Sequence, residues 1–329
     1  MESKKTNNTS TEAVSLSTSE LNGEMNRKRK KKFDPHGFHP VTNWGMNIAL
    51  AIFTFMCLFP FFYVIMISFT DEATIAKKGY QLIPEKWSLE AYKYLWHMKE
   101  QLLQSYGVTI FITVVGTVIS VMMIAFYAYA ISRKQFKYRR FFTFFAFFTM
   151  LFGGGMVPFY IVATQFLGLK DSIWALILPL SMNAFYIIIM RTFFMRSVPE
   201  SILESARIDG ASELRTFFQI VFPLSLPGIA TIALFSTLGY WNDWFNALLF
   251  IDKPTLVPLQ SLLMKIESNL EFMRQNIEIS ATQSSLFSSI PADTAKMAMV
   301  VIATLPIAVS YPFFQKYFIS GLTIGGVKE

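Results

Sequence analysis

Few residues of this chain have the types and spacing that catalysis requires. The three histidines lie outside the apolar runs, at His36, His39 and His97. The first two could form a weak metal pair, although solvated sequence beside a basic tail is the simpler interpretation. No His-Glu-x-x-His motif is present, and Val327 stands where a phosphate-binding loop would place lysine after Gly321 and Gly326. The sequence therefore predicts no catalytic residue, no metal site, no cofactor and no enzymatic activity for this chain.

The elements that must position any functional residue are long apolar runs. The 329 residues are 53% hydrophobic and only 16% charged, against about 25% charged in ordinary soluble domains. A membrane-spanning helix takes about 20 apolar residues, and about six runs are long enough. They are Trp44 to Phe69, Gly107 to Ile131, Phe141 to Leu167, Ser172 to Phe194, Leu226 to Ile251 and Met297 to Phe318. The sequence predicts an all-α, multi-pass membrane protein, which argues against a soluble enzyme or a disulfide scaffold.

Three features of these runs bear on their structure and chemistry. The third run is interrupted by Gly153 to Gly155 and by Pro158, which predicts either a broken helix or a plain loop at the outer face. The single cysteine, Cys57, lies in an apolar run and excludes an intrachain disulfide. Asp243 is the only acid inside a predicted run, and intramembrane acids are costly and usually functional.

Basic residues predict the orientation of the chain in the membrane. Residues 1–42 are polar, carry a basic run at 27–32 and are expected to be a disordered tail, with residues 43–329 forming the transmembrane domain. A second basic cluster at 133–140 joins the second and third runs. The positive-inside rule places both clusters, and both termini, in the cytoplasm. Segments 70–106 and 252–296 then face outward, with room for short helices and a surface loop at Ser284 to Pro291. The net charge of +7 is thus expected to reflect topology, with anionic lipid as an alternative ligand of residues 27–32, and not nucleic acid.

The cytoplasmic loop from Ser197 to Pro227 reads as two short helices around a turn. Ser197 and Glu200 have the spacing of a capping box. Gly210 permits a sharp turn, and Asp209 is expected to cap the second helix, which runs to about Phe222.

The first of these helices carries an apolar stripe of Ile202, Leu203 and Ala206. A short amphipathic helix at the membrane face must dock on a surface. Lipid headgroups, its own spans or another protein would each serve.

At this loop the sequence resembles the EAA motif of importer-type ABC transporter permeases. The motif places Glu-Ala-Ala before a glycine, an isoleucine and Leu-Pro at fixed spacing. Here it reads Glu204-Ser205-Ala206, Gly210, Ile220 and Phe222-Pro223. Ser205 and Phe222 depart from the pattern. Further segments resemble the MalG-like carbohydrate-uptake branch, closest to the complex-oligosaccharide subgroup of Gram-positive bacteria: 153–158, 175–179, 239–245 and 315–323.

The resemblance implies a type I importer permease fold and a heteromeric complex. In that family the loop is a coupling helix that sits on a separate cytoplasmic ATPase dimer. The role would fall on Glu204, Ser205, Ala206, Asp209 and Gly210. A second homologous permease and an extracytoplasmic solute-binding protein complete the complex. The implied function is ATP-driven import of an oligosaccharide by alternating access.

A sugar path needs aromatic faces and hydrogen-bonding side chains, and the fifth run supplies both. Its candidates are Tyr240, Trp241, Asn242, Asp243, Trp244 and Asn246, with Asn183 and Tyr186 in the fourth run. An aromatic belt at the outer membrane interface explains the aromatic residues equally well. A stand-alone secondary transporter or channel, and an ABC permease for a non-sugar solute, also stay open; only ABC permeases need a docking helix at 197–227.

Overall fold

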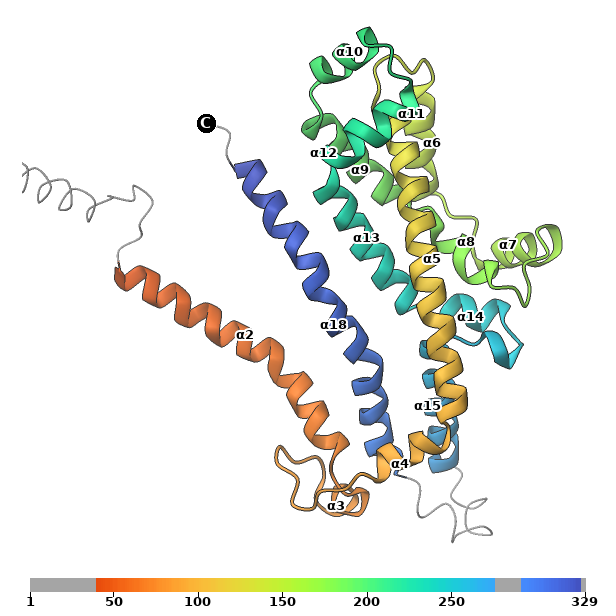
Figure 1. Ribbon diagram of the computed structural model, residues 1–329. Coiled ribbons are helices and arrows are strands. Elements are labelled where there is room, and N and C mark those ends of the chain that lie inside the picture. Colours follow the sequence, from red (N-terminus) through yellow and green to blue (C-terminus); the bar gives the residue numbers. More distant parts are fainter. Residues whose placement is uncertain (1–39, 276–290, 327–329) are drawn as a thin grey trace, which may run out of the picture. The chain divides into compact units, whose positions relative to one another are not determined.

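The computed structural model describes residues 40–275 and 291–326 (Figure 1). The chain divides into two compact units, residues 1–61 and 62–329, and each is described by itself. Helix α2, Pro40–Ser68, runs across that division. The predicted tail falls almost entirely outside the described residues, as does the predicted surface loop from Ser284 up to residue 290.

The described residues contain three single helices that are long and apolar enough to cross a membrane. They are α2, α5 (Lys99–Ser132) and the first part of α18 (Ala292–Gly326). Three bent helix pairs pass the same test, which gives up to six spans when each pair counts as one. The pairs join α6 (Arg139–Leu151) to α7 (Met156–Ile161) and η1 (Val162–Phe166), α8 (Trp174–Ser181) to α9 (Ala184–Ser197), and the segment Glu213–Leu224 to α13 (Leu226–Trp241). The prediction of an all-α, multi-pass protein is confirmed.

The third predicted run is a broken helix, bent by 114°. The break lies between α6 and α7, and Gly155 adopts a φ of +83°, a conformation that side-chain-bearing residues avoid. Pro158 lies inside α7, in its first turn, where the missing proline N–H costs nothing. The glycines therefore make the break, and the proline belongs to the helix that follows.

The fifth predicted run, Leu226 to Ile251, is not one continuous helix. Helix α13 ends at Trp241, and a separate short helix, α14 (Phe245–Phe250), follows. Asp243 stands between the two, and its carboxylate accepts hydrogen bonds from the backbone N–H of Asn246 at 3.2 Å and from its side-chain amide at 3.0 Å. Because a local side-chain acceptor competes with helical backbone bonding, these polar residues end one helix and start the next.

Helix α5 runs through both hydrophobic clusters of the unit 62–329. Leu102 and Ile112, in its first half, belong to a cluster with residues of α8, α14, α15 (Leu259–Gln275) and α18. Its second half, including Ile124 and Ile131, belongs to a cluster with α9 and the loop that follows α9. Between the two halves, Gly116 lets the ring of Tyr240 approach so closely that an added Cβ would lie 2.6 Å from it. Helix α5 is thus the common support of both clusters.

Short helices occupy the two segments predicted to face outward. They are α3 (Glu72–Lys78), α4 (Glu90–His97), η3 (Pro254–Leu256) and α15. Figure 1 shows α3, α4 and α15 at the opposite end of the unit from the loop that follows α9. Glu72 ties this end together because its carboxylate accepts the backbone N–H groups of Asp293 at 2.9 Å and Thr294 at 3.0 Å, at the start of α18.

Candidate functional site: the loop between α9 and α13

The loop after α9 folds as the predicted helix, turn and second helix. Helix α10 spans Glu200–Ile208, and Gly210 forms the turn with a φ of +75°. The second helix begins with α11 (Glu213–Thr216) and continues through η2 (Phe217–Val221) and α12 (Phe222–Leu224). The bend to α13 is 83°. The loop is therefore an ordered structure that projects from the end of the bundle (Figure 1).

Both predicted caps of this loop are wrong. Ser197 ends α9, so the capping position of α10 falls to Pro199, which makes no side-chain cap bond. Asp209 ends α10, and its N–H donates to the carbonyl of Ser205 at 3.0 Å. The cap of α11 is Ser212, whose hydroxyl accepts the N–H of Arg215 at 3.3 Å. Gly210 and Ala211 separate Asp209 from the cap position at Ser212, and the sequence pattern alone did not indicate the length of this turn.

Helix α10 docks on its own chain through part of the predicted stripe. Leu203 is 1% exposed and Ala206 is 6% exposed, whereas Ile202 is 40% exposed. Leu203 belongs to the cluster that holds Phe194 of α9 and Phe217 of η2. Burial of a leucine side chain is worth about 1.5–3 kcal/mol, so this contact holds the helix in place.

Two apolar side chains are exposed on the surface around the turn. Ile208, the last residue of α10, is 86% exposed, and Leu214 of α11 is 65% exposed. Four of the five predicted coupling residues are exposed, and Ala206 alone is buried. Glu204, Ser205, Asp209 and Gly210 thus lie on the accessible side of the loop, while Ala206 belongs to its docked side.

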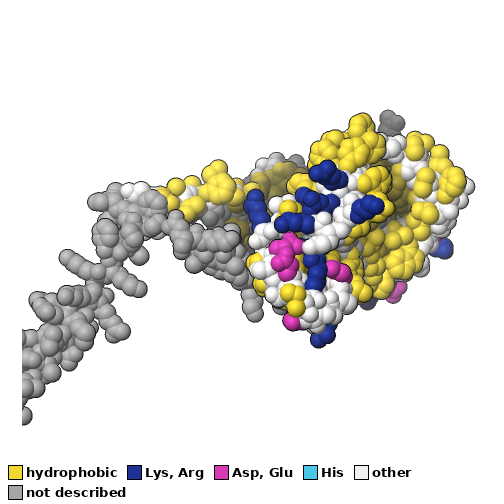
Figure 2. Space-filling model, turned by 90° about the horizontal axis from the view of Figure 1, so that it is seen from above, with side chains coloured by type: hydrophobic (Ala, Val, Ile, Leu, Met, Phe, Trp, Pro, Cys, Tyr) yellow, Lys and Arg dark blue, Asp and Glu magenta, His cyan; other side chains and the backbone are white. Residues whose placement is uncertain are grey.

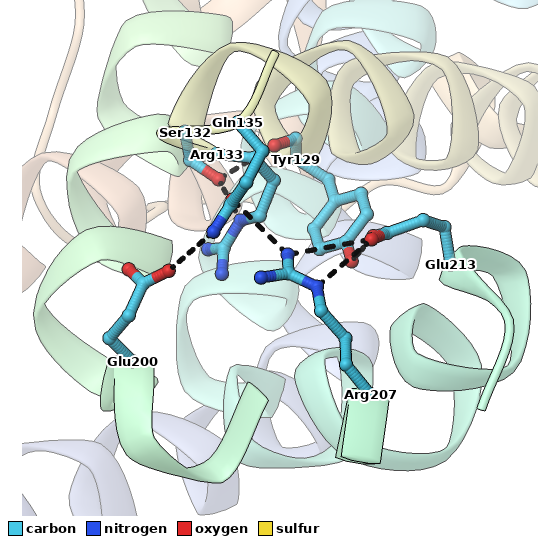
Figure 3. Close-up of polar contacts among 7 residues, drawn as sticks. All are labelled: Tyr129, Ser132, Arg133, Gln135, Glu200, Arg207 and Glu213. Carbon is cyan, nitrogen blue, oxygen red and sulfur yellow. Dashed lines mark hydrogen bonds and ion pairs between the residues drawn. The ribbon is translucent and has the colours of Figure 1, made fainter. Parts of the chain in front are cut away.

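A polar network joins this loop to the end of α5. Figure 3 shows Tyr129, Glu213 and Arg207 converging from three helices. The Tyr129 hydroxyl donates to Glu213 Oε2 at 2.6 Å, and the guanidinium of Arg207 contacts Oε1 of the same carboxylate at 3.4 Å. A hydrogen bond to a charged group contributes about 1.5–3 kcal/mol when shielded. The half-exposed ion pair contributes about 0.2–1 kcal/mol.

The linker after α5 contacts both ends of α10. Gln135 Nε2 donates to Glu200 Oε1 at 3.4 Å, and Gln135 Oε1 accepts from Arg207 Nη2 at 3.1 Å. Lys134 Nζ lies 4.0 Å from the other Glu200 oxygen. Glu200 and Arg207 stand seven residues apart, two turns on one face of the helix. A single linker therefore holds α10 along its length.

Arg133 joins the network through its contacts with Tyr129 and Ser132. Its guanidinium lies 5.0 Å from the centre of the Tyr129 ring, and its Nε donates to Ser132 Oγ at 3.0 Å. Burial lowers the pKa of the Arg133 guanidinium from its ordinary value, but arginine stays protonated in proteins. The cation orients the tyrosine, whose hydroxyl then points at Glu213.

Sequence reasoning missed most of this network. In the sequence Tyr129 is one residue of an apolar run, and no motif assigns a role to Gln135 or Glu213. One signal was available: Arg207 and Glu213 carry opposite charges on the two sides of the Gly210 turn. Tyr129 and Glu213 are 84 residues apart in sequence, and nothing in the linear pattern indicates that their side-chain oxygens lie 2.6 Å apart in the fold.

The structure scatters the residues predicted for a sugar path. Tyr240 and Trp241 are buried, with the Tyr240 hydroxyl donating to the carbonyl of Ile177 at 2.8 Å and Trp241 Nε1 to that of Ala303 at 3.1 Å. Asn242 and Trp244 are exposed. The two buried aromatic residues thus join helices. The Asn242 amide donates to the carbonyl of Leu238 at 3.0 Å, and its Oδ1 accepts from Gln260 Nε2 at 3.4 Å.

The candidates in the fourth run have local roles. Asn183 caps α9, because its Oδ1 accepts the N–H groups of Phe185 at 2.9 Å and Tyr186 at 3.3 Å. The Tyr186 ring is half-buried and stacks on Phe235 at 5.9 Å between centroids. Among the described residues, no group of three His, Cys, Asp or Glu side chains is arranged to hold a metal ion; His36 and His39 lie outside them.

Basic side chains gather on the face that carries the loop. Figure 2 looks down on this end and shows Lys and Arg side chains outnumbering Asp and Glu. The linker 133–140, with five basic residues in the sequence, lies at this end beside α10 (Figure 1). The fold and the loop together define a class: a multi-pass helical membrane protein with a folded helix–turn–helix between two of its spans.

Comparison with known proteins gives the family. The model of the binding-protein-dependent transport system inner membrane component matches residues 128–324, and the chain belongs to this family. Two proteins of Bacillus subtilis (strain 168) are similar over most of their length. The polygalacturonan/rhamnogalacturonan transport system permease protein YtcP is 41% identical over 279 residues, which is 85% of this chain and 95% of YtcP. Protein LplC is 42% identical over 272 residues, 82% of this chain and 89% of LplC.

A solved structure agrees with these relatives. It is a bacterial ABC transporter involved in the import of the acidic polysaccharide alginate. A chain of that transporter superposes with a TM-score of 0.72 and 32% identity, over 86% of this chain and 99% of its own length. The predicted resemblance to importer-type ABC permeases of the carbohydrate branch is confirmed. The chain is a multi-pass inner membrane component of a binding-protein-dependent transport system.

Proposed function

We propose that this chain is the permease subunit of an ATP-driven importer that moves an oligosaccharide across the cytoplasmic membrane by alternating access. The names of YtcP and of the alginate transporter, both concerned with polysaccharides, support the class of solute. The probe of choice is an oligogalacturonide, because it shares its chemistry with the substrate named for YtcP. An ABC permease for a non-sugar solute is the alternative that this probe tests.

The observation that carries the proposal is the surface of the loop. Its helix is held by Leu203 and Ala206, yet Ile208 and Leu214 stay exposed beside the Gly210 turn. Exposed apolar residues rimmed by charged ones are typical of protein–protein contacts. The partner proposed for this surface is a separate cytoplasmic ATPase dimer. The residues that would contact it directly are Glu204, Ser205, Asp209 and Gly210. Ala206 would hold the helix by packing against the rest of this chain.

The other partners follow from the family and from the charge on the molecule. A second, homologous permease would complete the membrane part, and an extracytoplasmic solute-binding protein would deliver the sugar to segments 70–106 and 252–296. The basic face around α10 supports a cytoplasmic position for the loop, and thus for both termini, because cytoplasmic segments are rich in Lys and Arg. Lipid surrounds the spans. ATP is hydrolysed by the partner, so the chain itself is not an enzyme.

The sugar path is proposed along the polar end of α13. Asn242 and Trp244 would contact the solute, with Asp243 held nearby by Asn246. Tyr240 and Trp241 would form the wall and become accessible when the helices separate. Alternating access requires each ligand to bind the two conformations with different affinity. Asn183 and Tyr186 would line the path from α9.

The test of this proposal is co-elution of the ATPase. The chain is co-expressed with the neighbouring transporter genes and purified in detergent, as wild type and as Ile208→Asp. The matched control is Ile83→Asp, since Ile83 is 73% exposed at the other end of the unit. We expect the ATPase to co-elute with wild type and with the control but not with Ile208→Asp. Absence of the ATPase from the wild-type complex in several detergents would overturn the proposal in favour of a stand-alone transporter.

A further inference from the structure

Helix α5 has the properties of a lever. It is a continuous helix of 34 residues with no internal proline, and at 1.5 Å per residue it is about 50 Å long. The other connections to the loop are bent or broken. The pair α8 and α9 bends by 50°, and the path from α11 to α13 bends by 83°. A push on the loop would be absorbed at those bends, whereas α5 has none.

The loop is attached to one end of this lever by side chains. Tyr129, in the last turn of α5, donates to Glu213 at 2.6 Å, and Arg207 binds the same carboxylate. Glu213 belongs to the second helix of the loop and Arg207 to the first. One carboxylate therefore connects α5 with both helices on either side of the turn (Figure 3).

The other end of α5 is attached just as firmly. The Tyr106 hydroxyl donates to the carbonyl of Ile302 in α18 at 2.7 Å. The hydroxyl of Thr109 accepts the N–H of Leu259, at the start of α15, at 2.8 Å and is fully buried. Tyr106 and Tyr129 stand 23 residues apart, about 35 Å along the helix. A displacement of one end of α5 would therefore move the elements at the other end.

We propose that Tyr129, Arg207 and Glu213 are positioning residues that fix the coupling loop to α5, so that α5 carries the stroke of the ATPase to the opposite end of the subunit. The proposal rests on the function proposed above. The three residues need not touch nucleotide or solute. Their role is to make the loop and α5 move as one body.

The experiment follows the far end of α5 and needs no solute. In a Cys57→Ser background, which removes the native thiol, a cysteine replaces Leu103, which is 70% exposed near the start of α5. The rate of maleimide labelling of that cysteine is measured in the purified complex, with and without ATP and vanadate. We expect nucleotide to change the labelling rate in this background by about fivefold or more, within the usual range of coupling between sites.

Two variants break the link, and a third restores it. Tyr129→Phe removes one hydroxyl and Glu213→Ala removes the carboxylate; both should abolish the nucleotide effect while the ATPase still co-elutes. Exchange of the two charges, Arg207→Glu with Glu213→Arg, should regain much of the effect, because the ion pair is rebuilt and the introduced arginine can donate to the Tyr129 hydroxyl. The matched control is Glu85→Ala, which removes an ion pair with Lys78 at 2.6 Å at the other end of the unit.

The outcomes separate this inference from the function on which it rests. Loss of ATPase from the wild-type complex would overturn the function itself. With the ATPase bound, an unchanged labelling rate at position 103 in the wild-type background would overturn the lever. A nucleotide effect that survives Tyr129→Phe, or that Glu85→Ala removes equally, would overturn the role of the three residues. If Glu213→Ala fails to fold, Tyr129→Phe and the charge exchange still decide.

Discussion

Carboxylates hold both ends of the unit 62–329, but they bind different partners. Away from the loop, two carboxylates accept backbone N–H groups: Glu72 receives those at the start of α18, and Asp171 receives those of Asp252 and Lys253. Side-chain pairs such as Glu85 with Lys78 occur there as well. At the loop, Glu200 and Glu213 accept from side chains. By its backbone caps the first is the stable end; the second, where the loop and α5 are proposed to move together, is the mobile end.

Helix α5 connects the two ends, and the largest effect on stability is expected where it passes the Tyr240 ring. Gly116 lies where α5 passes the Tyr240 ring, and an added Cβ would meet three ring atoms within 2.8 Å. We expect Gly116→Ala to cost about 1–3 kcal/mol of stability, the usual cost of overpacking. Thermal unfolding in detergent measures the effect. Gly107→Ala is the control on the same helix, since nothing lies within 4 Å of its added Cβ. Equal melting temperatures for the two variants would contradict the close packing.

The cap at the stable end should come next in size. Glu72→Ala leaves the N–H groups of Asp293 and Thr294 without this acceptor, and Thr294 is only 1% exposed. Loss of a helix cap costs about 0.5–2 kcal/mol. Glu90→Ala, at the start of α4, serves as the control and should change the melting temperature less. If the two substitutions lowered the melting temperature equally, the carboxylate of Glu72 would not stabilise the protein as a cap.

The link at the mobile end should matter little for stability. Glu213→Gln keeps an oxygen that can accept the Tyr129 hydroxyl, so it removes only the charge that pairs with Arg207, and the Glu213 side chain of that pair is 60% exposed. Its cost should be about 0.2–1 kcal/mol, less than that of Glu72→Ala. The same thermal unfolding series checks this order. A Glu213 variant that melts below the Glu72 variant would reverse the contrast between the two ends.

The smallest effect on stability is expected from Asp171, and it is recognised by its dependence on pH. The backbone N–H groups of Lys253 and Asp252 hold the pKa of the Asp171 carboxyl below its ordinary value. Stability from this carboxylate is therefore fully present above about pH 4, the unfolded pKa, and is lost as the pH falls through the lower folded pKa. Asp171→Asn keeps the positive φ of 56° accessible. Its melting temperature should fall below that of wild type at neutral pH and approach it in acid. A difference independent of pH would exclude the carboxylate as the cause.

The sequence was informative about spans and about the loop because both depend on local pattern. Long apolar runs predicted the spans. Gly153 to Gly155 predicted either a broken helix or a plain loop in the third run, and the structure has the broken helix. Gly210 predicted the turn that the structure contains. The break in the fifth run was not predicted, because hydropathy does not register the local hydrogen bond of Asp243. Its carboxylate accepts the N–H of Asn246 in the first turn of α14, which begins at Phe245.

The network at the loop was beyond local reasoning. The contact between Tyr129 and Glu213 joins residues 84 positions apart and depends on how α5 packs against the loop. Burial of Tyr240 likewise depends on its contact with Gly116. Sequence reasoning recognised Tyr240 as aromatic and could not tell whether the ring faces solute, lipid or another helix. Roles that depend on tertiary contacts required the structure.

The most direct test of the account is uptake of a labelled oligogalacturonide into proteoliposomes that hold the whole complex with its binding protein. The account predicts uptake that requires ATP and the ATPase subunit, and that Ile208→Asp abolishes. Uptake by this chain without ATPase, driven by an ion gradient, would contradict it and identify a stand-alone transporter.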